Sequence, residues 1–162
     1  MRNLDLRRCS VKPTAARVTS GSVAVMTRPS DRVGDARAVA RWGLAALLAA
    51  AGASHLTWGR RGYRIVVPDW AVRLTTLDKD AIVVASGAVE LMLAGALVAL
   101  PKEKSGVGRL VAAFFVAVFP GNVHQWQTGR SAPMMRTDRA RFVRLLLQPA
   151  LVGWALWSTR AR

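Results

Sequence analysis

The residues of this chain that could do chemistry are polar side chains set inside otherwise apolar stretches. Ser86 and Glu90 stand four residues apart in one such stretch, and Arg144 and Gln148 stand four apart in another. A spacing of four places two side chains on one face of a helix. Because polar groups inside apolar segments are costly, each needs a structural or functional reason. The candidates for a polar pocket are His55, Ser86, Glu90, Asn122, Arg144 and Gln148.

The chemistry of these candidates centres on Glu90. Paired with Arg144 or His55, its carboxylate could carry a proton or bind a ligand, but the same pair could equally be a structural lock between helices. His55 could instead cap a helix end, and His124 sits beside Trp126 near the expected membrane interface. Two histidines could in principle ligate haem iron, yet no spacing demands it, and we expect neither haem nor a metal site.

Four apolar segments must position these residues. They cover about residues 39–57, 81–100, 107–126 and 142–158. A helix of twenty residues is about 30 Å long, which matches the hydrocarbon thickness of a bilayer. Tryptophans stand at the segment ends, as is typical of membrane interfaces. We therefore predict an all-α, integral membrane four-helix bundle. A soluble bundle is the rival, but helices that are apolar all round cannot all be interior in so small a protein.

Up-and-down threading would bring the candidates to one side of the membrane. Odd segments end, and even segments begin, on the same side, so the four segments contribute to one polar layer. Pro120 and Gly121 predict a bend or unwinding in the third segment, and Pro149 predicts the same in the fourth, because proline cannot donate to the preceding turn. Asn122 would then cap freed backbone groups.

The first 37 residues read as a disordered basic tail, and residues 38–159 as the transmembrane domain. Met26 is an alternative start, in which case the tail is an over-long reading of the gene. A competing interpretation takes the basic stretch, the following apolar run and Ala51-Gly52-Ala53 as a cleavable signal peptide. Counting Lys and Arg favours both termini on the cytoplasmic side. A start at Met26 would remove five of those residues and leave the two sides nearly equal.

Composition excludes several classes of protein. The 162 residues are 52% hydrophobic, which excludes intrinsic disorder, and the single cysteine, Cys9, excludes an internal disulfide. The net charge of +15 lies in the tail and in loops between apolar segments, where it suits anionic lipid headgroups. Nucleic-acid binding would need that charge on one folded face, so we do not expect it.

Five short motifs, in order, carry a family resemblance. They are GASHL at 52–56, IVVP at 65–68 followed by Trp70, SGAVEL at 86–91, VFPGN at 118–122 and LQP at 147–149. Their order and spacing resemble the DoxX-like family of small bacterial four-helix membrane proteins over about residues 40–158. The resemblance implies a bundle in the plasma membrane and an association with quinone-linked oxidoreductase complexes. It does not fix an activity.

Three functions follow as hypotheses. The first is a multi-pass plasma-membrane subunit of a quinone-linked redox system, in which Glu90 and His55 bind or relay protons to a quinone head and an oxidoreductase subunit is the partner. The second is a non-catalytic membrane anchor or scaffold. The third, a small transporter, would need association of the chain with copies of itself. Whether the chain is an enzyme stays open.

Overall fold

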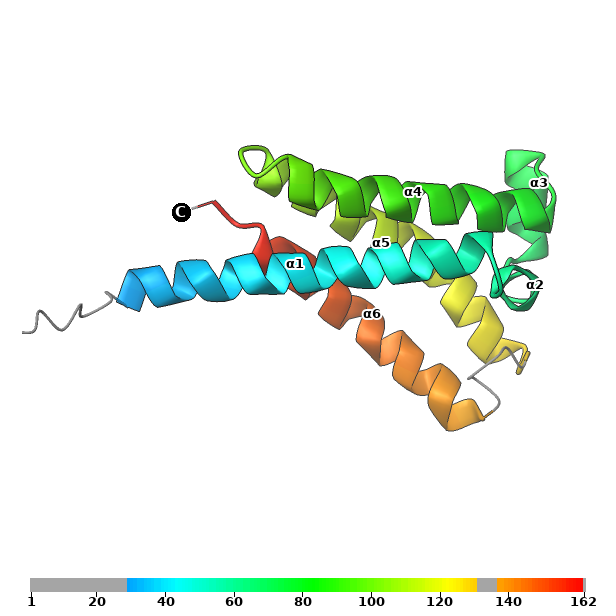
Figure 1. Ribbon diagram of the computed structural model, residues 1–162. Helices are drawn as coiled ribbons and strands as arrows, with labels where there is room; N and C mark the ends of the chain where they lie inside the picture. Colours follow the sequence, from blue (N-terminus) through cyan, green and yellow to red (C-terminus); the bar gives the residue numbers. More distant parts are fainter. Residues whose placement is uncertain (1–28, 131–136, 162) are drawn as a thin grey trace, which may run out of the picture.

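The structure, a computed structural model, describes residues 29–130 and 137–161, where the regular elements are all helices and there is no strand (Figure 1). The all-α prediction is confirmed for them. Four long helices and two short ones follow in order along the chain. They are α1 (Pro29–Leu56), α2 (Arg60–Tyr63), α3 (Asp69–Thr75), α4 (Lys79–Ala99), α5 (Lys104–Gln127) and α6 (Asp138–Ser158).

The long helices fall on the four predicted segments, with one correction at the N-terminal end. Helix α1 begins at Pro29, so residues 29–37, which we expected in the tail, are helical. Proline suits the first position of a helix because its missing N–H has no partner to lose there. Residues 1–28, with Cys9 and the alternative start at Met26, lie outside the described residues, as does the disorder predicted for them.

Side-chain caps explain where α4 and α6 begin. The Asp78 carboxylate accepts a hydrogen bond from the Ala81 N–H at 2.6 Å, and the Thr137 hydroxyl accepts one from the Ala140 N–H at 3.2 Å. Each bond satisfies a backbone donor that has no partner within the helix. Both helices therefore start at polar residues a few positions before their apolar runs.

The long helices form two antiparallel pairs that diverge toward one end. Helix α1 lies along α4, and α5 lies along α6 (Figure 1). The pairs meet near the C-terminus, where the Trp154 indole N–H donates to the Ala40 carbonyl at 3.0 Å. They separate toward the end where α2 and α3 lie (Figure 1). Two cavities lie between the pairs toward this end.

The hydrophobic core fills the end where the pairs meet. Leu44, Leu48, Leu97, Val111 and Ala155 are at most 1% exposed there. At the same end, a Cβ placed on Gly108 would lie 1.7 Å from the Thr159 hydroxyl oxygen, so only glycine fits beneath the end of α6. Close packing therefore holds the two pairs together at this end. The connector, the segment 57–78 between α1 and α4, lies at the other end (Figure 1).

The two internal prolines do not interrupt their helices. Helix α5 continues through Pro120 and Gly121, and α6 continues through Pro149. The helices are therefore not unwound at these positions, and the alternative, a bend, stays a prediction. Pro120 lies in the last third of α5, so the helix on either side of it is long enough to carry a single lost hydrogen bond.

Three of the helices are long and apolar enough to cross a membrane. These are α1 from Arg32, α4 and α5. Helix α6 is not among them, because Asp138, Arg139, Arg141 and Arg144 occupy its first two turns and two less apolar residues follow at 148–149. The crossing of a membrane by all four long helices thus stays a prediction.

The connector between α1 and α4 is clipped to α4 by ion pairs. Arg60 and Arg64 in and after α2 both pair with Asp80, and Asp69 in α3 lies 2.6 Å from the Lys79 ammonium. Lys79 holds the pKa of the Asp69 carboxyl below its usual range through this hydrogen bond. A carboxyl with a lowered pKa stabilises the fold above its ordinary pKa, so this clip is lost as the pH falls through the lowered value.

We predict that Asp80→Asn loosens the connector without unfolding the protein. The pairs are exposed, so the free energy of unfolding should fall by less than about 1 kcal/mol. Trypsin cleavage after Arg60 and Arg64, followed by mass spectrometry, should rise several-fold. The control is Asp35→Asn, which makes the same charge change at an exposed position of α1. Equal cleavage in both variants would show that Asp80 does not hold the connector.

Candidate functional site

Two glycines bring α1 and α4 into close contact at the site. A Cβ on Gly52 would lie 2.7 Å from the Gly87 carbonyl oxygen, and one on Gly87 would lie 2.8 Å from the His55 Cβ. Small residues let helix backbones approach closely, which is a common device in membrane proteins. His55 and Glu90 each follow one of these glycines by three residues and so lie beside the contact.

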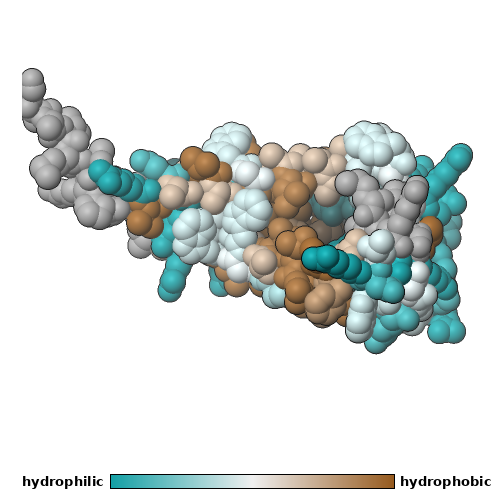
Figure 2. Space-filling model, turned by 90° about the horizontal axis from the view of Figure 1, so that it is seen from below, coloured by the Kyte–Doolittle hydropathy of each residue, from teal (hydrophilic) through white to brown (hydrophobic). Residues whose placement is uncertain are grey.

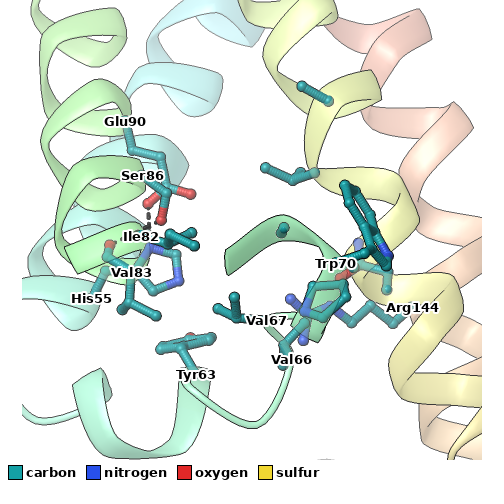
Figure 3. A pocket seen from close by; sticks show the side chains of 16 residues that line it. His55, Tyr63, Val66, Val67, Trp70, Ile82, Val83, Ser86, Glu90 and Arg144 are labelled. Carbon is teal, nitrogen blue, oxygen red and sulfur yellow. Dashed lines mark hydrogen bonds and ion pairs between the residues drawn. The ribbon is translucent and has the colours of Figure 1, made fainter. Parts of the chain in front are cut away.

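The close contact places His55 against Glu90. The His55 Nδ1 and the Glu90 Oε2 are 2.6 Å apart (Figure 3). Their side chains are only 13% and 9% exposed, so the pair is largely shielded from solvent. Of the two partners weighed for Glu90, the structure gives it His55. A proton on Nδ1, in either the neutral or the charged imidazole, makes His55 the donor.

Tyr63 at the end of α2 supports this pair. Its ring packs edge-on against the His55 imidazole, with ring centroids 4.0 Å apart, and its hydroxyl accepts from the Ser54 hydroxyl at 3.3 Å. A ring packed in this way limits how far the imidazole can turn. Tyr63 thus fixes the orientation of His55 from the connector side.

Asn122 and Arg144 face this pair from the other helices. Asn122 in α5 is 5% exposed, and its side chain makes no hydrogen bond to the residues in the ranges 29–130 and 137–161. Arg144 in α6 donates to the Gln125 Oε1 at 3.4 Å. In Figure 3, Arg144 lies across the cavity from His55 and Glu90. The α1–α4 pair therefore supplies one polar wall and the α5–α6 pair the other.

The two remaining predicted residues are satisfied within the helices. The Ser86 hydroxyl donates to the Val83 carbonyl at 2.9 Å, one turn back in α4. The Gln148 amide, 6% exposed, donates to the Phe115 carbonyl in α5 at 2.9 Å. Gln148 therefore ties α6 to α5, and Ser86 makes only a local bond. Their contribution to the site is to its shape.

The polar residues surround two adjoining cavities of about 200 Å³ each. The first lies under the connector and is lined mainly by apolar residues of α3, α4 and α5 (Figure 3). The second lies deeper, between α1, α5 and α6. Ser86 and Gly121 line only the first, and Gln148 lines only the second. The residues shared by both are His55, Tyr63, Glu90, Val118, Asn122 and Arg144.

All six residues proposed from the sequence thus line one or both cavities, while other polar residues were missed. Tyr63 stands in a connector that reads only as basic, and nothing in its spacing points to His55. Gln125, 1% exposed, did carry a signal, since it follows Asn122 by three residues and so shares its helix face. His124, on another face of α5, lines neither cavity.

The arrangement can bind a polar group and hold a proton beside it. A carboxylate and an imidazole at 2.6 Å can share a proton. Asn122 and Arg144 provide donors on the opposite wall, and the asparagine oxygen can also accept. Among the described residues, no cluster of three His, Cys, Asp or Glu could hold a metal ion. The chemistry offered by these side chains is hydrogen bonding and proton transfer.

A family model covers the whole of this site. It is described as Domain of unknown function (DUF8561), and it matches residues 44–159. The chain belongs to this family. The DUF8561 match starts within α1, takes in every residue that lines the two cavities, and ends after α6. No curated protein and no solved structure matches the chain. Family membership here carries no activity, so function must be argued from the cavities.

Proposed function

We propose that this DUF8561 protein is a multi-pass protein of the plasma membrane, with α1, α4, α5 and α6 crossing the bilayer. Only 28%, 28% and 33% of the most apolar windows of α1, α4 and α5 is buried inside the molecule. Among the other residues of these helices are exposed apolar side chains such as Leu47, Leu91 and Val116, and contiguous apolar surface of this kind is uncommon on a soluble monomer. Figure 2 shows part of it as brown side chains over the middle of one face. Lipid is the solvent that suits such a surface.

Exposed tryptophans support the same placement. Trp58 follows α1, Trp70 lies in α3 and Trp126 lies at the end of α5, all near the connector, whereas Trp42 lies in α1 well before its end and Trp157 lies at the end of α6. Each of these five side chains is more than 40% exposed. Tryptophan prefers both membrane–water interfaces because its ring is apolar and its N–H seeks a polar partner. The two groups mark where the hydrocarbon region begins and ends.

Within that membrane protein, we assign the cavities to a quinone. The observation that carries this proposal is Asn122, which is 95% buried, lacks a hydrogen-bond partner among the described residues, and lines both cavities opposite the His55–Glu90 pair. Asn122 is not among the fully enclosed polar side chains without a partner in the described residues, so its amide faces the cavities, where a polar ligand can bind it. A cavity of about 150 Å³ can hold a benzene ring, and each of these is about 200 Å³.

The residues fit the needs of a quinone head. A bound quinone supplies two carbonyl oxygens as acceptors, and its reduction to a quinol takes up two electrons and two protons. Asn122 and Arg144 donate toward one side of the cavity. The His55–Glu90 pair holds a proton on the other side, with Tyr63 keeping the imidazole in place. Electrons come from an oxidoreductase partner subunit, in line with the DoxX-like resemblance.

The test is the quinone content of purified protein. We predict that Glu90→Gln leaves the fold intact, because the glutamine oxygen can still accept from the His55 Nδ1–H, but lowers retained quinone at least tenfold. Protein expressed in its native membrane is extracted in mild detergent, and its lipids are chromatographed. Quinone-linked turnover with the partner should fall in parallel.

The control is Glu103→Gln, which makes the same change in the exposed turn between α4 and α5. It should leave the quinone content at the wild-type level. Absence of quinone from the wild-type protein would contradict the proposal. Equal quinone in all three proteins would keep the ligand but remove Glu90 from its binding.

A membrane anchor without chemistry is the second candidate, and the glycine contact favours it. Gly52, Gly87, His55 and Glu90 together form a tight lock between α1 and α4 that needs no ligand. In that case Glu90→Gln would lower the melting temperature in detergent and change no activity of a partner complex. A modest loss of stability is expected in either case, so the turnover of the partner complex, measured on this variant, separates the two functions.

A further inference from the structure

The second cavity lies on the membrane side of the first and shares its polar rim. Its own lining is apolar, with side chains from three helices around it. These are Leu47, Leu48, Ala51, Phe114, Phe115, Leu147 and Leu151, together with Gln148. It extends from His55 and Glu90 toward the middle of α1, which is the middle of the proposed membrane. The polar residues shared by both cavities thus lie between two mainly apolar cavities. Such an arrangement suits an amphipathic ligand.

The second cavity also reaches the lipid-facing surface. Leu47 of α1 and Leu147 of α6 line it, and they are 42% and 53% exposed. They come from the two helices that diverge from the end where the pairs meet (Figure 1). Figure 2 shows the face seen from below, where hydrophobic side chains flank a hollow. The cavity therefore opens between α1 and α6 at membrane depth.

From this geometry we infer that the ligand is a single amphipathic molecule whose ring lies in the first cavity and whose apolar chain lies in the second. The apolar chain of the ligand passes Asn122, one of the polar residues shared by both cavities. It then leaves between Leu47 and Leu147 into the bilayer. The inference rests on the proposed function, and it adds that the quinone carries a long chain and enters sideways from the membrane. The connector, clipped to α4 by its ion pairs, covers part of the first cavity.

Two probes test this inference: a dimethoxy-methyl benzoquinone bearing a decyl chain, and the same ring without the chain. Binding to the full chain in lipid nanodiscs is followed by quenching of tryptophan fluorescence. Trp70 lines the first cavity. Quenching that occurs in the wild type but not in Trp70→Phe therefore reports a ring bound in that cavity. The decyl probe should bind more tightly than the ring alone.

Filling the second cavity should separate the probes. Ala51 lines that cavity, so Ala51→Phe should weaken the decyl probe roughly tenfold, the order of an overpacking penalty, and the ring alone less than twofold. Ala50→Phe is the matched control, since Ala50 is exposed and lines neither cavity. If Ala51→Phe fails to fold, Leu147→Phe with Leu146→Phe as its control gives the same comparison at exposed positions.

The outcomes distinguish the two proposals. If the ring quenches Trp70 but Ala51→Phe leaves both probes unaffected, or weakens both equally, the inference is overturned and the quinone site stands. A bilayer lipid retained in the second cavity, seen by native mass spectrometry and lost in Ala51→Phe, would likewise overturn it. If neither probe quenches Trp70 in the wild type, the proposed function fails as well.

Discussion

His55→Phe should destabilise the protein by about 3 kcal/mol, because it leaves the Glu90 carboxylate without its partner. Glu90 is 7% exposed, and its Oε2 lies 2.6 Å from the His55 Nδ1. Removing one member of a buried ion pair costs about 3–5 kcal/mol, since the remaining charge is uncompensated. Phenylalanine keeps a ring beside Tyr63, so the loss reports the hydrogen bond. The measurement is reversible unfolding in mixed detergent micelles.

The double variant His55→Phe/Glu90→Leu is the decisive comparison. It removes the buried carboxylate along with its partner, so most of the lost stability should return. Glu90→Gln alone should cost only about 1 kcal/mol, because its oxygen can still accept. A double variant as unstable as His55→Phe would contradict the assignment of the loss to an unpaired carboxylate.

Gly87→Val should have a comparable effect by a different route. A Cβ on Gly87 would lie 2.8 Å from the His55 Cβ and 3.1 Å from the Gly52 carbonyl oxygen, and valine adds two methyl groups beyond it. Overpacking costs about 1–3 kcal/mol, and here the separation of α1 from α4 also breaks the His55–Glu90 hydrogen bond. We expect a loss of about 3 kcal/mol together with loss of quinone.

Gly95→Val in the same helix is the control. A Cβ there meets nothing within 4 Å, so this variant carries the same change in helix propensity without a clash. Gly87→Ala should fall between the two. If Gly87→Val and Gly95→Val are equally stable, the close contact between α1 and α4 does not hold the site together.

The sequence predicts the long helices and the candidate cavity residues for the same physical reason. Apolar runs of about twenty residues can bury their backbone polar groups only as helices, so 81–100 and 107–126 are readable from composition alone. Polar residues stand out against such runs. Glu90 and Gln148 were found because they interrupt apolar segments. Antiparallel threading of the helices then brings the polar ends of those segments together.

What escaped prediction depends on tertiary structure. Tyr63 lies in a basic connector whose two short helices are held by ion pairs to Asp80 and Lys79, and no periodicity of the connector reveals those partners. The choice of His55 over Arg144 as the neighbour of Glu90 depends on the Gly52–Gly87 contact, which a linear reading cannot place. At Pro120 the surrounding turns keep the helix continuous, so of the two effects predicted for this proline only a bend remains.

The pairing of the helices has a consequence for assembly. Helices α5 and α6 are consecutive and can dock as a hairpin soon after synthesis, and α1 needs only the connector to reach α4. The two pairs meet through contacts such as Trp154 with Ala40, which are 114 residues apart in the chain. Such long-range contacts form late, because the entropy of a long loop must first be overcome.

The cavities have one wall on each pair of helices, so they exist only after this last step. A molecule that contacts both walls would act as a cross-link between the halves and slow their separation.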